Sequence, residues 1–131
     1  MNKSPGKGPI SISLGVIGGS GAYDLLTNGV LGENVDTITL ETPFGKSAPI
    51  HHFRAGNLEY LFLSRHGEKD YSVTAPFVNY RANIYALKEC GVERIISWSG
   101  PGIINTSFKP GEYVLPSDII DETKNRKTTF F

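Results

Sequence analysis

The chain has 131 residues, with thirteen basic and thirteen acidic side chains and a formal net charge of zero at pH 7. This balance excludes a strong field for attracting nucleic acid or an anionic membrane, so we expect neither as a partner. Hydrophobic residues make up 39% and charged residues 20%, which is typical of one soluble globular domain of mixed α/β class.

The terminal and cysteine signals favour a cytoplasmic location. Cys90 is the only cysteine and cannot form an internal disulfide, which is usual in a reducing compartment. Residues 1–9 are polar with glycine and proline, and no signal-like apolar segment follows them, so we interpret them as a flexible leader before one domain over residues 10–131. No apolar run is long enough to span a bilayer.

The first third of the chain predicts two strands around a glycine loop. Residues 11–17 are expected to form a short buried strand that ends at the glycine cluster 18–21. Residues 22–27 are expected to form a short helix or turn, and residues 33–40 alternate like a half-buried strand. The apolar members of this strand are Val35, Ile38 and Leu40.

The middle of the chain predicts a hairpin followed by a polar loop. Residues 43–45 (Pro-Phe-Gly) mark a turn. Residues 49–54 and 58–63 are predicted to pair across residues 55–57, whose Gly-Asn sequence suits a tight hairpin turn. Residues 64–74 are rich in titratable groups and are expected to form a loop.

Residues 76–89 form the strongest predicted helix. Pro76 suits a first-turn position, and Gly91 suits the left-handed residue beyond the last turn. One apolar face is expected to contain Phe77, Tyr80, Ile84 and Leu87.

The last third predicts two more strands. Residues 95–98 are expected to form a buried strand that runs into the loop 99–102. Residues 112–121 are expected to contain a strand that Pro116 interrupts, which favours a sheet edge or a bend. The whole order suits an α/β domain with a mixed sheet flanked by helices. Because the chain closes on two phenylalanines at 130–131, we expect it to be a fragment cut before the partners of those rings.

Three loops at strand ends offer groups that bind anions. Backbone N–H groups of residues 18–21 can converge on an anion and the Ser20 hydroxyl can donate, although a tight turn would have the same sequence. Arg65 has the donor fork that matches phosphate and His66 can donate beside it, although the two could equally be a solvated surface pair. Ser99 and the Gly100 amide follow a predicted strand and could face a ligand.

Other kinds of site are excluded by pattern. His51 and His52 are adjacent on a predicted strand, so they point to opposite faces and cannot chelate one metal ion. No cluster at ligand spacing is present, and we predict no metal. Cys90 lies near a helix end and is expected to be packed, and no Gly-x-Ser-x-Gly elbow occurs. The loops therefore favour phosphate handling by positioning and electrostatics.

Seven segments follow one another along the chain in a distinctive order. They are GVIGGSG (15–21), ETPFG (41–45), SRHG (64–67), VNYRANIYALK (78–88), KPGE (109–112), DIID (118–121) and TKNR (123–126). In this order they resemble the 5′-methylthioadenosine phosphorylases and related trimeric purine nucleoside phosphorylases, and the resemblance covers residues 14–131.

The resemblance implies an incomplete phosphorylase/hydrolase-like fold and reversible phosphorolysis of a purine nucleoside. Phosphate attacks C1′ of the ribose and the purine leaves, without a metal or organic cofactor, in a homo-oligomer expected to be a trimer. Ser20, Arg65, His66 and Ser99 match phosphate-binding positions, and Gly100 matches a position near the nucleoside. The family's later half supplies the base-recognising acidic residue, so no catalytic residue is assigned here and this chain alone is expected to be inactive.

Two departures from the family pattern bear on the site. The family's Thr-Ala-Cys-Gly or Thr-Ala-Ala-Gly is here Ser99-Gly100-Pro101-Gly102, and Pro101 removes a backbone donor. The family's Arg after Arg-His-Gly is here Glu68, which adds a negative charge near the phosphate loop.

Two alternatives to an enzyme of this kind stay open from the sequence. One is a non-catalytic, degenerate module that binds phosphate or a nucleotide without turnover, which Pro101 and Glu68 allow. The other is an unrelated α/β protein with a nucleotide-binding glycine loop, against which the absence of both standard nucleotide fingerprints counts.

Overall fold

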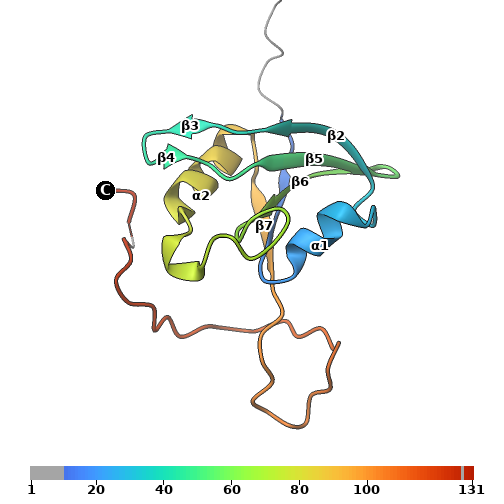
Figure 1. The fold of residues 1–131 in the computed structure, drawn as a ribbon, viewed down its shortest axis with the longest axis vertical. Coiled ribbons are helices and arrows are strands. Elements are labelled where there is room, and N and C mark those ends of the chain that lie inside the picture. The colour runs from blue at the N-terminus through green and yellow to red at the C-terminus, as the bar shows by residue number, and fades with distance from the viewer. Residues whose placement is uncertain (1–10, 128) are drawn as a thin grey trace, which may run out of the picture.

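The computed structural model describes residues 11–127 and 129–131, so the predicted leader, residues 1–9, lies outside the described residues. A five-stranded sheet and a small two-stranded hairpin form the β structure (Figure 1). The elements are β1 (Leu14–Gly18), α1 (Ala22–Thr27), β2 (Glu33–Ile38), β3 (Glu41–Thr42), β4 (Gly45–Lys46), β5 (Ile50–Ala55), β6 (Leu58–Ser64), α2 (Tyr80–Glu89) and β7 (Arg94–Trp98). A single 3₁₀ turn, Ala75–Phe77, precedes α2.

The main sheet is mixed, as predicted, with the strand order β2-β5-β6-β1-β7. β1 is parallel to both β6 and β7, whereas β5 is antiparallel to β6 and to β2. The register places Gly18 opposite Ser64 on one side and opposite Trp98 on the other. The carboxyl ends of β1, β6 and β7 therefore meet at one edge of the sheet, where parallel α/β proteins bind ligands.

The hydrophobic core has two parts, one on each face of the sheet, because side chains alternate along β1 and β6. On one face α2 packs through Ala86 and Leu87 against Leu61 and Leu63. On the other face α1 contributes Ala22 beside Phe62. The two helices thus lie on opposite sides of the sheet (Figure 1).

The predicted hairpin is confirmed. β5 and β6 pair from Ala55 and Leu58 inward, and the turn consists of Gly56 and Asn57. Gly56 has a φ of 60°, a conformation that glycine adopts without steric cost. The turn predicted at residues 43–45 is also present, between the short strands β3 and β4.

The predicted helix start was wrong by four residues. Pro76 lies in the 3₁₀ turn Ala75–Phe77, and Val78 is extended. The helix α2 begins only at Tyr80, where the Asn79 side chain accepts a hydrogen bond from the Ala82 N–H. Phe77 is consequently 81% exposed rather than on the buried face. The residues of α2 that are buried are Ala82, Asn83, Ala86 and Leu87.

The predicted helix end is confirmed in detail. Gly91 has a φ of 86°, and its N–H donates to the Lys88 carbonyl while the Val92 N–H donates to the Leu87 carbonyl. These two bonds form a Schellman motif, which satisfies carbonyls that the last turn leaves free. The chain then turns directly into β7.

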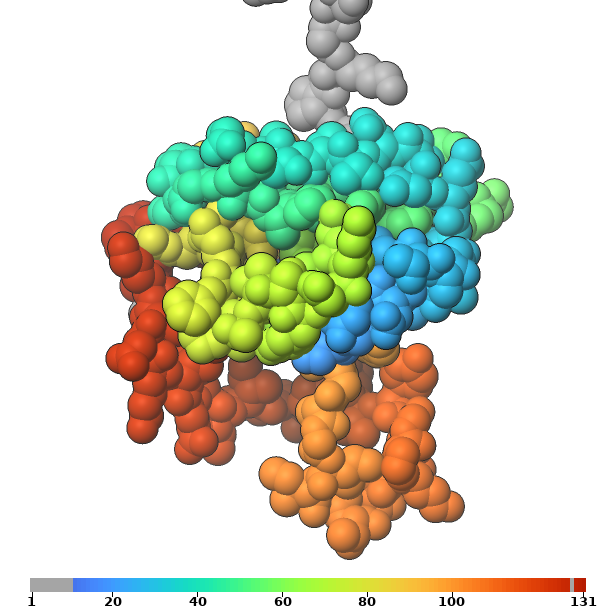
Figure 2. Space-filling model, viewed as in Figure 1, coloured from blue at the N-terminus to red at the C-terminus, as the bar shows by residue number. Residues whose placement is uncertain are grey.

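Three strand predictions need correction. β2 ends at Ile38, and a bulge between Asn34 and Asp36 breaks the alternation and leaves Val35 41% exposed. β7 is an edge strand, so Ile96, predicted to be buried, is 55% exposed. No strand forms within residues 112–121, since Pro116 interrupts the run and no described strand lies beside it to accept its backbone bonds. Figure 2 shows residues 100–127 as an extended arm beside the compact sheet and helices.

Candidate functional site

The carboxyl ends of β1, β6 and β7 are joined directly by backbone hydrogen bonds. The Gly19 N–H donates to the Trp98 carbonyl at 2.7 Å, and the Arg65 N–H donates to the Gly18 carbonyl at 3.1 Å. The three loops that the sequence singled out are thereby held side by side at one sheet edge.

Gly19 is the point where these loops touch. A Cβ placed on Gly19 would lie 2.6 Å from the Ser99 Cβ and 3.2 Å from the Arg65 Nη2. Neither distance leaves room for a side chain, and both the Arg65 guanidinium and Ser99 lie on the side of Gly19 from which a side chain would project. The structure therefore brings Arg65 and Ser99 together, as the anion-site hypothesis requires.

Ser20 lies on the same loop, directly after Gly19, and is exposed. Gly21, which follows, has a φ of 81° at the N-terminus of α1. The Ala22 N–H donates back to the Gly19 carbonyl at 3.1 Å, which closes the loop into a tight turn. The tight-turn interpretation is correct for this segment, and Ser20 is exposed on the turn.

His66 lies beneath Arg65 and is 1% exposed. The Arg65 Nε–H donates to the His66 Nε2 at 3.1 Å, so Nε2 acts as an acceptor. The His66 Nδ1 lies 2.8 Å from the Val73 carbonyl oxygen, which only accepts, so Nδ1 bears the ring proton. Both ring nitrogens are thus used within the protein, and the neutral imidazole orients the guanidinium.

The loop after His66 folds back on that side chain. The Val73 N–H donates to the His66 carbonyl at 2.8 Å, and the Tyr71 ring stacks on the imidazole with ring centroids 4.2 Å apart. Sequence reasoning missed Tyr71 and Val73 because their contacts with His66 depend on how the loop closes.

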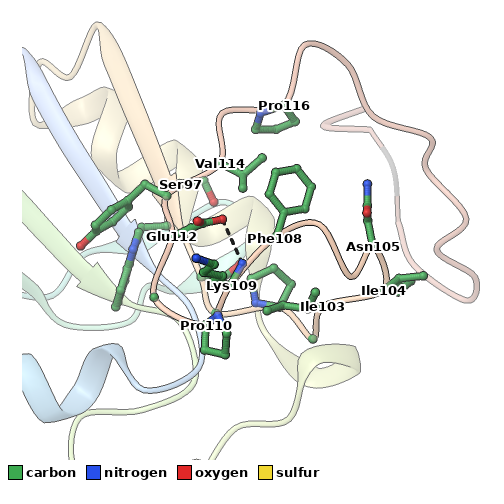
Figure 3. Close-up of a pocket in the computed structure, with 17 residues that line it drawn as sticks. Ser97, Ile103, Ile104, Asn105, Phe108, Lys109, Pro110, Glu112, Val114 and Pro116 are labelled. Carbon is green, nitrogen blue, oxygen red and sulfur yellow. Dashed lines mark hydrogen bonds between the residues drawn. The ribbon is translucent and has the colours of Figure 1, made fainter.

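Ser99 and Gly100 begin a second feature of this edge, a cavity of about 770 Å³ within the arm that follows β7. Figure 3 shows Ile103, Phe108 and Val114 among the side chains around it, and the Lys109 N–H donates to Glu112 at 2.9 Å. Arg65, His66 and Ser20 do not line this cavity. Of the predicted site residues, only Ser99 and Gly100 line the cavity, so the cavity adjoins the Arg65 side of the site through the loop that begins at Ser99.

Glu68, which the sequence placed as a negative charge near the phosphate loop, faces another partner. Its Oε1 lies 2.5 Å from the His51 Nε2 on β5. The neighbouring His52 instead contacts Glu59, 2.9 Å away, so the two histidines point apart as predicted. Among residues 11–127 and 129–131, no group of three or more His, Cys, Asp or Glu side chains could hold a metal ion.

A family model for the Phosphorylase superfamily matches residues 13–131. The chain belongs to this superfamily. It is 44% identical, over 90% of its length, to a probable 6-oxopurine nucleoside phosphorylase of Thermococcus kodakarensis. It is 42% identical, over 91% of its length, to the S-methyl-5′-thioadenosine phosphorylase of Saccharolobus solfataricus. The family expected from the sequence is confirmed.

A solved structure has the same fold over the shared part. The methylthioadenosine phosphorylase from Schistosoma mansoni in complex with tubercidin is 33% identical and superimposes with a TM-score of 0.57, covering 66% of this chain and 29% of that chain. The present chain spans 42% and 43% of the lengths of the two curated relatives above. The mixed sheet with its helices is thus part of the nucleoside phosphorylase fold.

Within the described residues, no helix has the length and apolar character needed to cross a membrane.

Cys90 is buried, and burial together with the nearby Glu89 raises the pKa of its thiol.

Proposed function

We propose that this chain provides the phosphate site of an enzyme that cleaves the N-glycosidic bond of a purine nucleoside, 5′-methylthioadenosine or a close relative. Inorganic phosphate is the co-substrate, and no metal or organic cofactor takes part. The observation that carries the proposal is that the Arg65 guanidinium and Ser99 both lie within 3.2 Å of the point where a Cβ of Gly19 would stand. The names of the relatives, which are purine nucleoside phosphorylases, supply the reaction class.

Each proposed group has a distinct task. Arg65 offers charged N–H donors that match two phosphate oxygens, while Ser20 and Ser99 offer hydroxyl donors from the flanking loops. His66 holds the guanidinium through Nε2, and its part in phosphate binding is through Arg65. Gly100 lies where the nucleoside side of the site would begin.

The chemistry needs positioning more than covalent catalysis. A phosphate oxygen forms a bond to C1′ as the bond from C1′ to the purine nitrogen breaks, and the purine leaves with that electron pair and takes up a proton. Holding the phosphate dianion beneath C1′ stabilises the positive charge that develops on the ribose. We assign no residue of this chain to protonating the purine. We also expect a homo-oligomer, a trimer by the family resemblance.

The test measures phosphate-dependent purine release from methylthioadenosine and inosine by the native protein that carries this chain. Arg65→Ala is expected to lower the rate at subsaturating phosphate by about 10²-fold or more, since a charged bidentate contact is lost. Arg94→Ala is the matched control, because Arg94 is exposed at the opposite end of β7. Equal rates for the two variants would refute the assignment of Arg65.

The same experiment separates an enzyme from a degenerate binding module. Phosphate binding that depends on Arg65, without purine release from either nucleoside, would identify a module that binds without turnover. Pro101, which removes a backbone donor beside Gly100, is the feature that such a result would implicate.

A further inference from the structure

Glu68 is tied to the sheet by a single side-chain hydrogen bond. Its Oε1 lies 2.5 Å from the Nε2 of His51, a residue of β5 whose side chain is only 11% exposed. In the described chain, no other side-chain hydrogen bond joins residues 68–74 to a strand. This hydrogen bond therefore links the loop to β5.

The partners of His51 determine what it offers to Glu68. The Nδ2 of Asn34, which can only donate, lies 3.2 Å from the His51 Nδ1, and the Thr37 Oγ1 lies 2.9 Å from the same nitrogen. Nδ1 is thus the acceptor, and the ring proton is on Nε2, where it donates to the Glu68 carboxylate. β2 holds the imidazole in the orientation that the loop uses.

The same loop carries the proposed phosphate ligands. Glu68 follows Arg65 and His66 by three and two residues, and the loop closes where Val73 bonds to His66. The orientation of the Arg65 guanidinium depends on the His66 ring, and the ring depends on the loop that Glu68 ties to β5. A chain of contacts therefore runs from β2 through His51 to the guanidinium.

We propose that His51 and Glu68 are positioning residues of the phosphate site, whose hydrogen bond holds the loop against β5 and thereby orients the Arg65 guanidinium beside Gly19 and Ser99. Glu68 acts through the loop and does not touch phosphate. The inference rests on the proposed function for the role of Arg65.

The chain contains a matched control for this pair. His52 is the next residue on β5 and bonds to Glu59 at 2.9 Å. The side chains are 11% and 42% exposed, against 11% and 41% for His51 and Glu68. Both pairs join a β5 histidine to a carboxylate of similar exposure, but Glu59 also accepts from Arg54. Glu59 lies on β6, and within the described residues its side-chain hydrogen bonds go to β5 and none goes to the loop that contains Glu68.

The experiment compares Glu68→Ala, Glu68→Gln and Glu59→Ala in the native protein that carries this chain. Inorganic phosphate is titrated to obtain Kd, and hydrogen exchange is measured at the Val73 amide. Glu68→Ala is expected to raise both the phosphate Kd and the Val73 exchange rate about fivefold, the usual effect of losing one part-exposed charged hydrogen bond. Glu68→Gln keeps an oxygen that accepts from His51 and is expected to restore most of both values.

Glu59→Ala is expected to change neither quantity. The inference is overturned if Glu68→Ala and Glu59→Ala have the same effect on Val73 exchange, or if Glu68→Gln is no closer to wild type than Glu68→Ala. If the wild-type protein does not bind phosphate, the proposed function fails, and with it the aiming of Arg65. The exchange measurements then still decide whether His51 and Glu68 hold the loop.

Discussion

The contact at Gly19 makes a sharp prediction for Gly19→Ala. The new Cβ would lie 2.6 Å from the Ser99 Cβ and 3.2 Å from the Arg65 Nη2 and the Trp98 carbonyl oxygen. Because carbon atoms normally approach to about 3.5–4.0 Å, the Ser99 loop would have to move by about 1 Å. The effect is steric, since Gly19 is not among the glycines with a positive φ.

The expected magnitude follows from this displacement. Overpacking of this kind costs about 1–3 kcal/mol, and we expect the free energy of unfolding to fall by about 2 kcal/mol. A 1 Å shift of binding groups can cost on the order of 10²-fold, so phosphate affinity is expected to fall by about 10- to 100-fold. Urea unfolding measures the first quantity, and titration with inorganic phosphate measures the second.

Gly56→Ala separates the two effects. Gly56 has a φ of 60° and open space on the side where alanine would carry its Cβ, and it lies in the hairpin turn between β5 and β6. Its substitution costs about 1–2 kcal/mol through backbone strain, but phosphate affinity is expected to stay at the wild-type value. The reasoning would be refuted if Gly19→Ala bound phosphate as tightly as Gly56→Ala does.

Three further predictions concern stability and reactivity. Asn79→Ala removes the acceptor for the Ala82 N–H and the donor to the Phe44 carbonyl, and is expected to lower the free energy of unfolding by about 1–2 kcal/mol in urea; an unchanged midpoint would contradict the assigned cap. The hydrogen bonds from Arg54 and His52 hold the pKa of Glu59 below its ordinary value of 4.5, so Glu59 stabilises the fold above that pH and loses this contribution as the pH falls through the lowered pKa. The stability difference between wild type and Glu59→Gln is therefore expected to shrink on acidification below 4.5, and a difference constant over that range would disprove the coupling. Burial raises the pKa of the Cys90 thiol, so alkylation by iodoacetamide is expected to be slow in the folded protein and fast in urea, and equal rates would show that Cys90 is accessible.

The parts of the fold that the sequence predicted are those set by local backbone chemistry. The Gly56-Asn57 turn and the left-handed Gly91 each require a glycine conformation that few other residues adopt, so both were correctly placed. The start of α2 was missed because Pro76 suits a 3₁₀ turn as well as a helix. Only the Asn79 side chain, bonded to Ala82, decides where the helix begins.

Burial was harder to predict than strand formation. Ile95 and Ile96 have the apolar pattern of a buried strand, and β7 does form, but burial depends on a neighbour that the pattern does not specify. The residues around Pro116 were predicted to form a strand from their apolar pattern, but they do not form one. A strand needs a neighbouring strand to satisfy its backbone hydrogen-bonding groups, and the local sequence does not specify that neighbour.

In the site, the sequence predicted where residues lie better than it predicted what each side chain does. The predicted groups Arg65 and Ser99 do lie beside the same residue, Gly19, because the register of β1 with β6 and β7 places their loops at one edge. The roles of charged and titratable side chains depend instead on hydrogen-bond partners. His66 was predicted to bind phosphate beside Arg65, and in the structure its Nδ1–H donates to the Val73 carbonyl while its Nε2 accepts from the Arg65 Nε–H.

The role of Glu68 also depends on its hydrogen-bond partner, and in this case the partner turns an expected unfavourable effect into a favourable one. From the sequence alone, the negative charge of Glu68 is expected to repel an anion bound at Arg65, three residues earlier. In the structure that carboxylate bonds to His51, so its charge is directed to β5 and the loop gains an attachment. On the inference proposed above, a departure from the family pattern that looked unfavourable for phosphate binding supports the proposed site instead. The substitution Glu68→Ala distinguishes the two effects. If Glu68 mainly repels the anion, the variant would bind phosphate more tightly, whereas if its hydrogen bond to His51 holds the loop in place, the variant would bind phosphate more weakly.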